Sequence, residues 1–135
     1  MEPVTLVDAE NVRRSTWPNI GKEELVELVR AWAEATGSPA LVVFDGRSPP
    51  TDGGLLVKVV SATGESADDR IARDARNLAA TGRAYRLVTS DRGLSERAGV
   101  AADDVLGGGT FVRTLQAVTS GPSAPSTPEA PSPQA

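Results

Sequence analysis

The 135-residue sequence contains no cysteine and no histidine. The absence of cysteine excludes disulfides, zinc ribbons and thiol nucleophiles. The absence of histidine excludes Ser-His pairs, imidazole metal ligands and the paired-imidazole route to RNA cleavage. Any chemistry must therefore use carboxylates, hydroxyls, amides, arginine or lysine. Carboxylate and carbonyl oxygens suit hard cations such as Mg²⁺ or Mn²⁺.

Long hydrophobic runs are missing too, since no apolar segment approaches the ~20 residues of a membrane-spanning helix. The N-terminus lacks the basic and apolar pattern of a signal peptide, so we expect a cytoplasmic protein without a membrane partner. The net charge is −4, from 18 acidic and 14 basic residues. This balance argues against nonspecific coating of nucleic acid but permits a local arginine patch.

The length fits one domain with its own core. Five of the ten prolines fall in the last 14 residues, mixed with serine, alanine and threonine. We therefore expect a folded domain over residues 1–118 and a disordered tail over residues 119–135, to which we assign no chemistry.

Strand and helix patterns alternate along the folded part. The strands are expected at residues 4–7, 40–44, 55–60, 84–89 and 110–112, and the helices at 22–35, 66–80 and 94–98. Trp32 lies on an apolar helical stripe and is expected in the core. Lys58 indicates an edge strand, and the glycines at 107–109 are interpreted as a flexible turn. The alternation predicts an α/β fold with a mainly parallel sheet and helices on both faces.

Three of the predicted strands run directly into an aspartate: Asp8, Asp45 and Asp91. If the strands are parallel, these carboxylates meet at one edge of the sheet, where open α/β sheets place their ligands. Neither a Gly-x-Gly-x-x-Gly turn nor a phosphate-binding Gly-x-x-x-x-Gly-Lys-Ser/Thr loop is present. The repeated strand-end aspartate is therefore the main functional signal.

Helix geometry separates the two aspartates that follow the expected cap at Ser66. Asp68 shares a stripe with the apolar positions that pack on the sheet, whereas Asp69 shares one with Arg73 and Arg76 and should face water. Ionised carboxylates within ~5 Å repel each other by roughly 3 kcal/mol a pair at an effective dielectric near 20. Asp8, Asp45, Asp68 and Asp91 would therefore favour a divalent cation among them, with Asp69 as a further candidate ligand.

Each of these residues also has a structural interpretation. Asp8 and Asp91 could cap turns, Asp45 precedes a glycine in a good turn pair, and Asn11 fits a turn. Glu65 and Asp68 could simply complement a helix dipole. Four arginines near the aspartates could hold phosphates or merely balance charge: Arg13, Arg14, Arg47 and Arg92. Trp17 could stack a base or close the core over the first long helix.

Four segments resemble the NYN domain family, and in particular its YacP-like branch among the PIN-like nucleases. They are Asp8-Ala9-Glu10-Asn11, Val43-Phe44-Asp45-Gly46, Glu65-Ser66-Ala67-Asp68-Asp69-Arg70-Ile71 and Val88-Thr89-Ser90-Asp91. The resemblance covers about residues 1–113. It implies a PIN-like three-layer sandwich with a central sheet of four to five strands, a Mg²⁺ or Mn²⁺ site and ribonuclease activity.

The same resemblance implies roles for individual residues. Asp8, Asp68 and Asp91 look like metal-binding acids, and Asn11 looks like a group that orients substrate or water. Thr89 and Ser90 look like supporting hydroxyls. The first motif departs from the family, because Ala9-Glu10 stands where a glycine and an aromatic residue are usual. That departure bears on substrate preference more than on metal binding.

The sequence therefore predicts a metal-dependent endoribonuclease that cleaves RNA phosphodiester bonds with metal-activated water, in RNA processing or decay. The alternative is an RNA-binding adaptor of the same fold without turnover, which the overall acidity and Glu10 favour. A receiver-like domain is disfavoured because the only lysines, Lys22 and Lys58, are badly placed for it. A homodimer and a protein partner for the C-terminal tail stay open.

Overall fold

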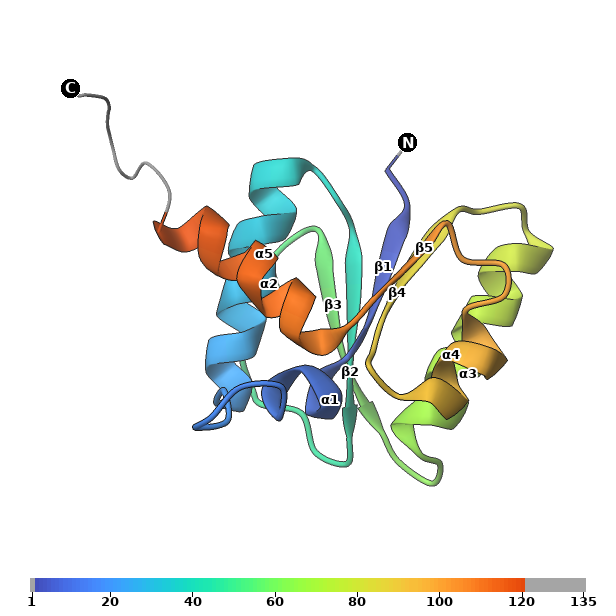
Figure 1. Ribbon diagram of the computed structural model, residues 1–135, viewed down its shortest axis with the longest axis horizontal. Helices are drawn as coiled ribbons and strands as arrows, with labels where there is room; N and C mark the ends of the chain where they lie inside the picture. The colour runs from blue at the N-terminus through green and yellow to red at the C-terminus, as the bar shows by residue number, and fades with distance from the viewer. Residues whose placement is uncertain (1, 121–135) are drawn as a thin grey trace.

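A parallel sheet of five strands forms the middle layer of the fold in the computed structural model, which describes residues 2–120 (Figure 1). The strands are β1 (Val4–Asp8), β2 (Ala40–Asp45), β3 (Val57–Ala62), β4 (Tyr85–Val88) and β5 (Asp104–Leu106). Their order is β3-β2-β1-β4-β5, and every neighbouring pair is parallel. The chain adds β2 and β3 on one side of β1 and then returns to add β4 and β5 on the other.

Helices cover both faces of this sheet. On one face lie α1 (Ala9–Arg13), α2 (Lys22–Thr36) and α5 (Gly108–Ser120), and on the other lie α3 (Ala67–Ala80) and α4 (Arg92–Ala98) (Figure 1). The predicted α/β sandwich with a mainly parallel sheet is thereby confirmed. Among the described helices, none combines the length and the apolar character needed to cross a bilayer.

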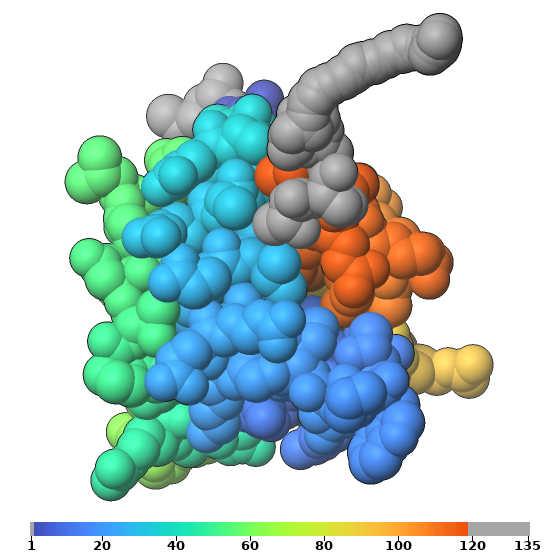
Figure 2. Space-filling view, turned by 90° about the vertical axis from the view of Figure 1, so that its left-hand side faces the viewer, coloured from blue at the N-terminus to red at the C-terminus, as the bar shows by residue number. Residues whose placement is uncertain are grey.

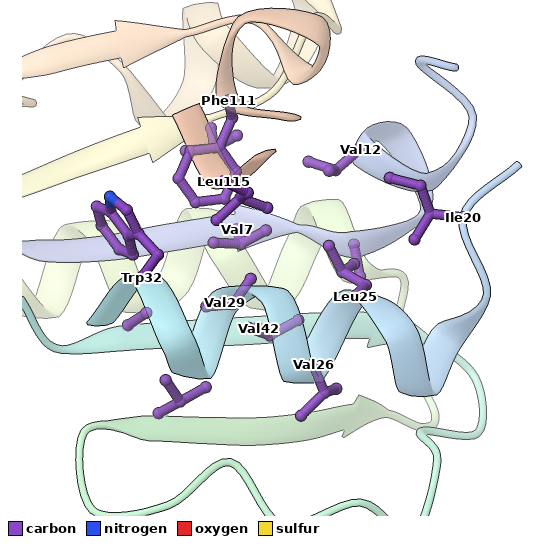
Figure 3. Close-up of a cluster of buried hydrophobic side chains, with 14 of the residues drawn as sticks. Val7, Val12, Ile20, Leu25, Val26, Val29, Trp32, Val42, Phe111 and Leu115 are labelled. Carbon is purple, nitrogen blue, oxygen red and sulfur yellow. The ribbon is translucent and has the colours of Figure 1, made fainter. Parts of the chain in front are cut away.

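Two apolar cores fill the spaces between the layers. The larger one joins α1, α2 and α5 to the sheet, with Val7 and Val42 as its floor (Figure 3). Trp32 and Phe111 meet edge to face in it, with ring centroids 5.3 Å apart at 81°, so the predicted core position of Trp32 is confirmed. On the other face, Ile71 of α3 and Leu94 of α4 pack against the opposite side of the sheet.

The expected last strand at residues 110–112 is wrong. These residues belong to α5, and the fifth strand is instead β5, which precedes the three glycines. Phe111, Val112 and Leu115 are buried together at helical spacing. A short apolar run is compatible with either a strand or a helix. Here the helix forms because these apolar side chains all pack on one side, against the core around α2. The glycines at 107–109 are correspondingly a helix start rather than only a flexible turn.

Smaller boundaries differ as well. Leu55 was expected in the third strand, but it lies before β3 and is fully exposed. Helix α5 continues to Ser120, and the rest of the predicted tail lies outside the described residues.

The edge position predicted for the third strand is confirmed, because β3 pairs only with β2 in the described sheet. Lys58 is exposed on it. Gly37 ends α2 in the left-handed conformation with φ of 70°, which glycine adopts without a Cβ penalty. The Ser66 hydroxyl accepts a hydrogen bond from the Asp69 N–H at 3.1 Å, so the expected cap of α3 is present.

Candidate active site

A cavity of about 210 Å³ opens at the carboxyl edge of the sheet and is lined by four aspartates. Asp8 ends β1, Asp45 ends β2, Asp91 follows β4, and Asp68 stands in the first turn of α3. Glu10, Asn11, Arg14 and Ala67 complete the lining. We call this cavity the acidic pocket. It lies beside β1, where the strand order reverses, and such switch points are where open α/β sheets form crevices.

Asp8 is the most deeply placed acid of the pocket, with 6% of its surface exposed. Its Oδ2 accepts a hydrogen bond from the Thr89 hydroxyl at 3.0 Å. Burial raises the pKa of Asp8 to about 6, and the negative charges of Asp68 and Asp91 add to the rise, whereas the Thr89 bond opposes it. The buried carboxyl is therefore protonated at mildly acidic pH and ionised only near neutrality.

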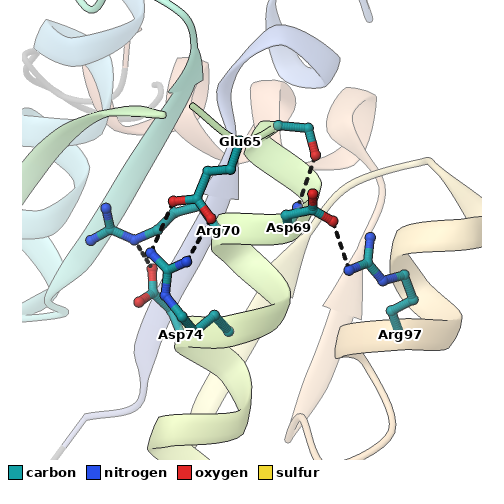
Figure 4. Close-up of polar contacts among 7 residues, drawn as sticks. Glu65, Asp69, Arg70, Asp74 and Arg97 are labelled. Carbon is teal, nitrogen blue, oxygen red and sulfur yellow. Dashed lines mark hydrogen bonds and ion pairs between the residues drawn. The ribbon is translucent and has the colours of Figure 1, made fainter. Parts of the chain in front are cut away.

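The two neighbouring aspartates of α3 have opposite surroundings. Asp68 lines the acidic pocket, and its pKa is raised by partial burial and by repulsion from Asp91 and Asp45. Asp69 accepts a hydrogen bond from Arg97 at 2.9 Å on the exposed surface, which lowers its pKa (Figure 4). The expected division between the two side chains is thus present. Asp69 faces water as expected, although its hydrogen-bond partner is Arg97 on α4 rather than an arginine of its own helical stripe.

Asp91 combines a structural and a pocket position. Its Oδ1 accepts the Leu94 N–H at 3.0 Å and caps α4, while its own N–H donates to the Thr89 hydroxyl at 3.1 Å. The turn interpretation of this residue is therefore present alongside the pocket interpretation. Asp45 is exposed at the rim and is followed by Gly46 with φ of 89°, so it too combines a turn with a place in the pocket lining.

Asn11 joins α1 to the segment after β4. Its Oδ1 accepts the Ser90 N–H at 2.8 Å, and the Ser90 hydroxyl in turn accepts the Gly108 N–H at 2.9 Å. A Cβ at Gly108 would lie only 2.9 Å from Asn11 Oδ1 and 3.3 Å from the main-chain oxygen of Asn11. Residue 108 must therefore be small for α5 to start beside α1. Sequence reasoning saw only a turn in this glycine run.

Glu10 also lines the pocket, although it was not among the predicted site residues. Its Oε1 accepts a hydrogen bond from Arg13 at 2.6 Å, while its buried Oε2 has no hydrogen-bond partner among the described residues. The sequence feature that could have identified Glu10 is its place inside the first motif, between Asp8 and Asn11. A fifth carboxylate therefore adds negative charge to the pocket wall.

The four arginines that were candidates for phosphate binding differ in their position relative to the acidic pocket. Arg14 lines the pocket and its side chain is 69% exposed. Arg13 instead faces its own loop, where it pairs with Glu10 and donates to the Ile20 carbonyl at 2.7 Å. Arg47 and Arg92 do not line the pocket. Only Arg14 is therefore placed by the fold beside the aspartates.

Glu65, a candidate of the third motif, is engaged elsewhere. Arg73 donates to both of its carboxylate oxygens, at 2.5 and 2.9 Å, which lowers the pKa of Glu65 (Figure 4). Arg70 and Asp74 form a second pair along α3 at 2.9 Å. These contacts tie down the segment that carries Asp68, but they leave Glu65 outside the pocket.

The donor set of the pocket fits a hard divalent cation by its chemistry, since it consists of carboxylates and one amide. Burial raises the pKa values of Asp8 and Asp68 most, and repulsion from neighbouring aspartates adds to both rises, a repulsion that a bound cation would offset. Over residues 2–120, however, no three acidic side chains converge into a ready metal-binding group. Holding a cation would therefore require these side chains to close around it.

A larger cavity, of about 460 Å³, lies between α2, α5 and the opposite edge of the sheet, with Thr5 and Arg86 among its lining. None of the predicted site residues lines it. A cleft lined by titratable groups with perturbed pKa values is a functional-site candidate with a physical rationale. The acidic pocket is therefore the stronger candidate despite its smaller size.

Comparisons with known proteins bear on the fold. No protein-family model matches the chain, and no curated protein matches its sequence. The crystal structure of Rae1 (YacP) from Bacillus subtilis matches with a TM-score of 0.69 at 20% identity, over 88% of this chain and 76% of that one. A point mutant of the same protein matches with a TM-score of 0.68 at 20% identity, over 87% and 77%. The chain therefore has a YacP-like fold of the PIN-like α/β class.

Proposed function

We propose that the chain is a metal-dependent endoribonuclease whose active site is the acidic pocket. The observation that carries the proposal is the gathering of Asp8, Asp68 and Asp91 around one pocket. Burial there raises the pKa of Asp8 to about 6, and the negative charges of Asp68 and Asp91 add to the rise. A fold has no stability reason to gather such charges, because each pair is unfavourable. A cation would offset the repulsion, and the YacP-like fold agrees with the branch that the sequence motifs resemble.

In this proposal Asp8, Asp68 and Asp91 hold Mg²⁺ or Mn²⁺, with Asp45 at the rim. When bound, such an ion lowers the pKa of water and stabilises the charge on a phosphate under attack. Arg14 holds a neighbouring phosphate by charge-assisted hydrogen bonds. Thr89 orients Asp8, and Asn11 fixes Ser90 beside the pocket.

The test is cleavage of end-labelled RNAs, one unstructured and one forming a hairpin, by the purified chain. We expect internal cuts with Mg²⁺ or Mn²⁺, none with excess chelator, and none with Asp91→Asn at the same protein concentration. Matched DNA strands separate RNA from DNA preference, since activated water needs no 2′-hydroxyl. RNA that stays intact with either metal would overturn the proposal.

One observation favours the alternative of an RNA-binding adaptor without turnover. No three acidic groups of the described chain converge into a metal-binding group, and Glu10 adds further charge to the wall. An adaptor would bind RNA equally well in chelator and as the Asp91→Asn variant. The endoribonuclease should instead bind more tightly when the metal is present.

A further inference from the structure

The two tryptophans of the chain have opposite environments. Trp32 is 5% exposed in the core, whereas Trp17 is 90% exposed in the loop between α1 and α2. The sequence alternative that Trp17 closes the core is therefore wrong. Indole rings are normally buried or used at interfaces, because their large apolar surface is unfavourable in water. We therefore expect the exposed indole of Trp17 to contact a binding partner.

The loop that carries Trp17 is closed at its base by hydrogen bonds. The Ile20 N–H donates to the Arg13 carbonyl at 3.1 Å, and Arg13 Nε donates back to the Ile20 carbonyl at 2.7 Å. Ile20 is itself anchored in the apolar core. Trp17 is thus held out in solvent by an anchored loop rather than by a loose one.

This loop follows directly from a wall of the acidic pocket. Helix α1 contributes Glu10 and Asn11 to the lining, and Arg14, at its end, lines the pocket as well. Trp17 comes three residues later. The segment between α1 and α2, dark blue at the lower right of Figure 2, forms part of the protein surface. The carboxylate of Glu10, the guanidinium of Arg14 and the indole of Trp17 therefore follow one another along one short stretch of chain.

In a single nucleic-acid strand phosphates alternate with unpaired bases, so an exposed arginine and an exposed indole three residues apart offer one group for each. We infer that Trp17 stacks on an unpaired base of a single-stranded RNA whose neighbouring phosphate binds Arg14. The inference rests on the proposed function and names its substrate class. A paired base is already stacked inside its duplex, so the ring selects for single strands. With a net charge of −4, the protein cannot rely on overall attraction, and local stacking supplies affinity instead.

Binding is measured with the full chain carrying Asp91→Asn in Mg²⁺, so that the RNA stays intact. The ligands are an unstructured 12-nucleotide RNA and the same strand annealed to its complement. Single-stranded RNA should quench the emission of Trp17 and protect it from iodide, while the buried Trp32 contributes an unchanged background. Trp17→Ala should raise Kd roughly 10-fold and Trp17→Phe less, because the smaller ring still stacks.

The outcomes separate this inference from the proposed function. If Trp17→Ala binds the single strand as tightly as its parent, or if the duplex quenches equally, the inference is overturned even where cleavage occurs. Quenching by the single strand without any cleavage by the wild type would uphold the stacking and overturn the nuclease. Emission that shifts with protein concentration in the absence of RNA would show a protein contact at Trp17 and overturn the inference. Unchanged thermal unfolding of Trp17→Ala checks its fold.

Discussion

The hydroxyl of Thr89 lies between the main chain of Asp91 and the side chain of Asp8. It donates to Asp8 Oδ2 at 3.0 Å and accepts the Asp91 N–H at 3.1 Å. The two aspartates follow neighbouring strands that are far apart in sequence, and one buried hydroxyl sets their relative position. Burial raises the pKa of Asp8 most, and the hydrogen bond from Thr89 is the largest influence that opposes this rise.

Replacing Thr89 by valine should raise the pKa of Asp8 further. The shape of the side chain is kept, but the hydrogen bond that lowers this pKa is lost. The free energy of unfolding should fall by about 1–2 kcal/mol, because buried groups lose their partner. A carboxyl ¹³C NMR titration measures the first effect, and Thr89→Ser, which keeps the hydroxyl, is the control. An unchanged midpoint for Asp8 in Thr89→Val contradicts the assignment.

Asp8 should make the metal-free protein less stable at neutral pH than at acidic pH. The folded state keeps the Asp8 proton up to about pH 6, whereas the unfolded chain releases it near 3.8. The stability contribution is therefore complete below the unfolded pKa and is lost as pH rises through about 6. The loss is roughly 3 kcal/mol.

Urea unfolding in chelator from about pH 4 to pH 8 measures this effect as the difference between the wild type and Asp8→Asn. The variant cannot ionise at this position, so its curve should lack the decline. Carboxylates outside the pocket, such as the half-buried Glu65 and the exposed Asp69, contribute equally to both proteins and cancel. Parallel curves for the two proteins would contradict the raised pKa.

Metal ions should stabilise the protein strongly near neutral pH and weakly in acid. A cation needs ionised ligands, and Asp8 holds its proton below about pH 6. Thermal unfolding with Mg²⁺ or Mn²⁺ should therefore show a larger rise in Tm at about pH 7.5 than at about pH 5. Equal rises at the two pH values, or a rise retained in the Asp8→Asn, Asp68→Asn double variant, would place the ion elsewhere.

The adjacent acids of α3 provide a matched pair for activity. Asp68→Asn should lower RNA cleavage at least ~100-fold, because its carboxylate lines the acidic pocket. Asp69→Asn should leave cleavage nearly unchanged, since that side chain pairs with Arg97 on the surface. Initial rates at saturating metal measure both. Similar losses in the two variants would show that the pocket does not distinguish them.

The glycines that start α5 provide a second matched pair. Gly108→Ala should lower the free energy of unfolding by about 1 kcal/mol, since its Cβ displaces the Asn11 amide from Ser90. At Gly109 a Cβ meets only Arg113 Nη1 at 3.9 Å, and alanine there should stabilise α5 by ~0.5–1 kcal/mol. Denaturant unfolding of both variants measures the contrast. A stabilised Gly108→Ala would show that the approach of α5 to Asn11 is loose.

Sequence pattern alone predicted the parallel sheet and most of its helices. The apolar stripe of α2 and the Ser66 cap of α3 are local signals, and each was found where expected. It also predicted which of Asp68 and Asp69 faces the sheet, because helical spacing depends only on neighbours a few residues away. The aspartates at the strand ends line one pocket because parallel strands share one carboxyl edge.

Tertiary contacts decided what local spacing leaves open. Residues 110–112 became helix because Phe111 packs on Trp32, and the glycine at 108 is needed only because Asn11 lies against it. Arg14 alone of the four arginines entered the pocket lining, since Arg13 is occupied by its own loop. Periodicity reports which face of an element is apolar. Which side chains finally meet depends on segments that are distant in sequence, and no local pattern encodes their packing.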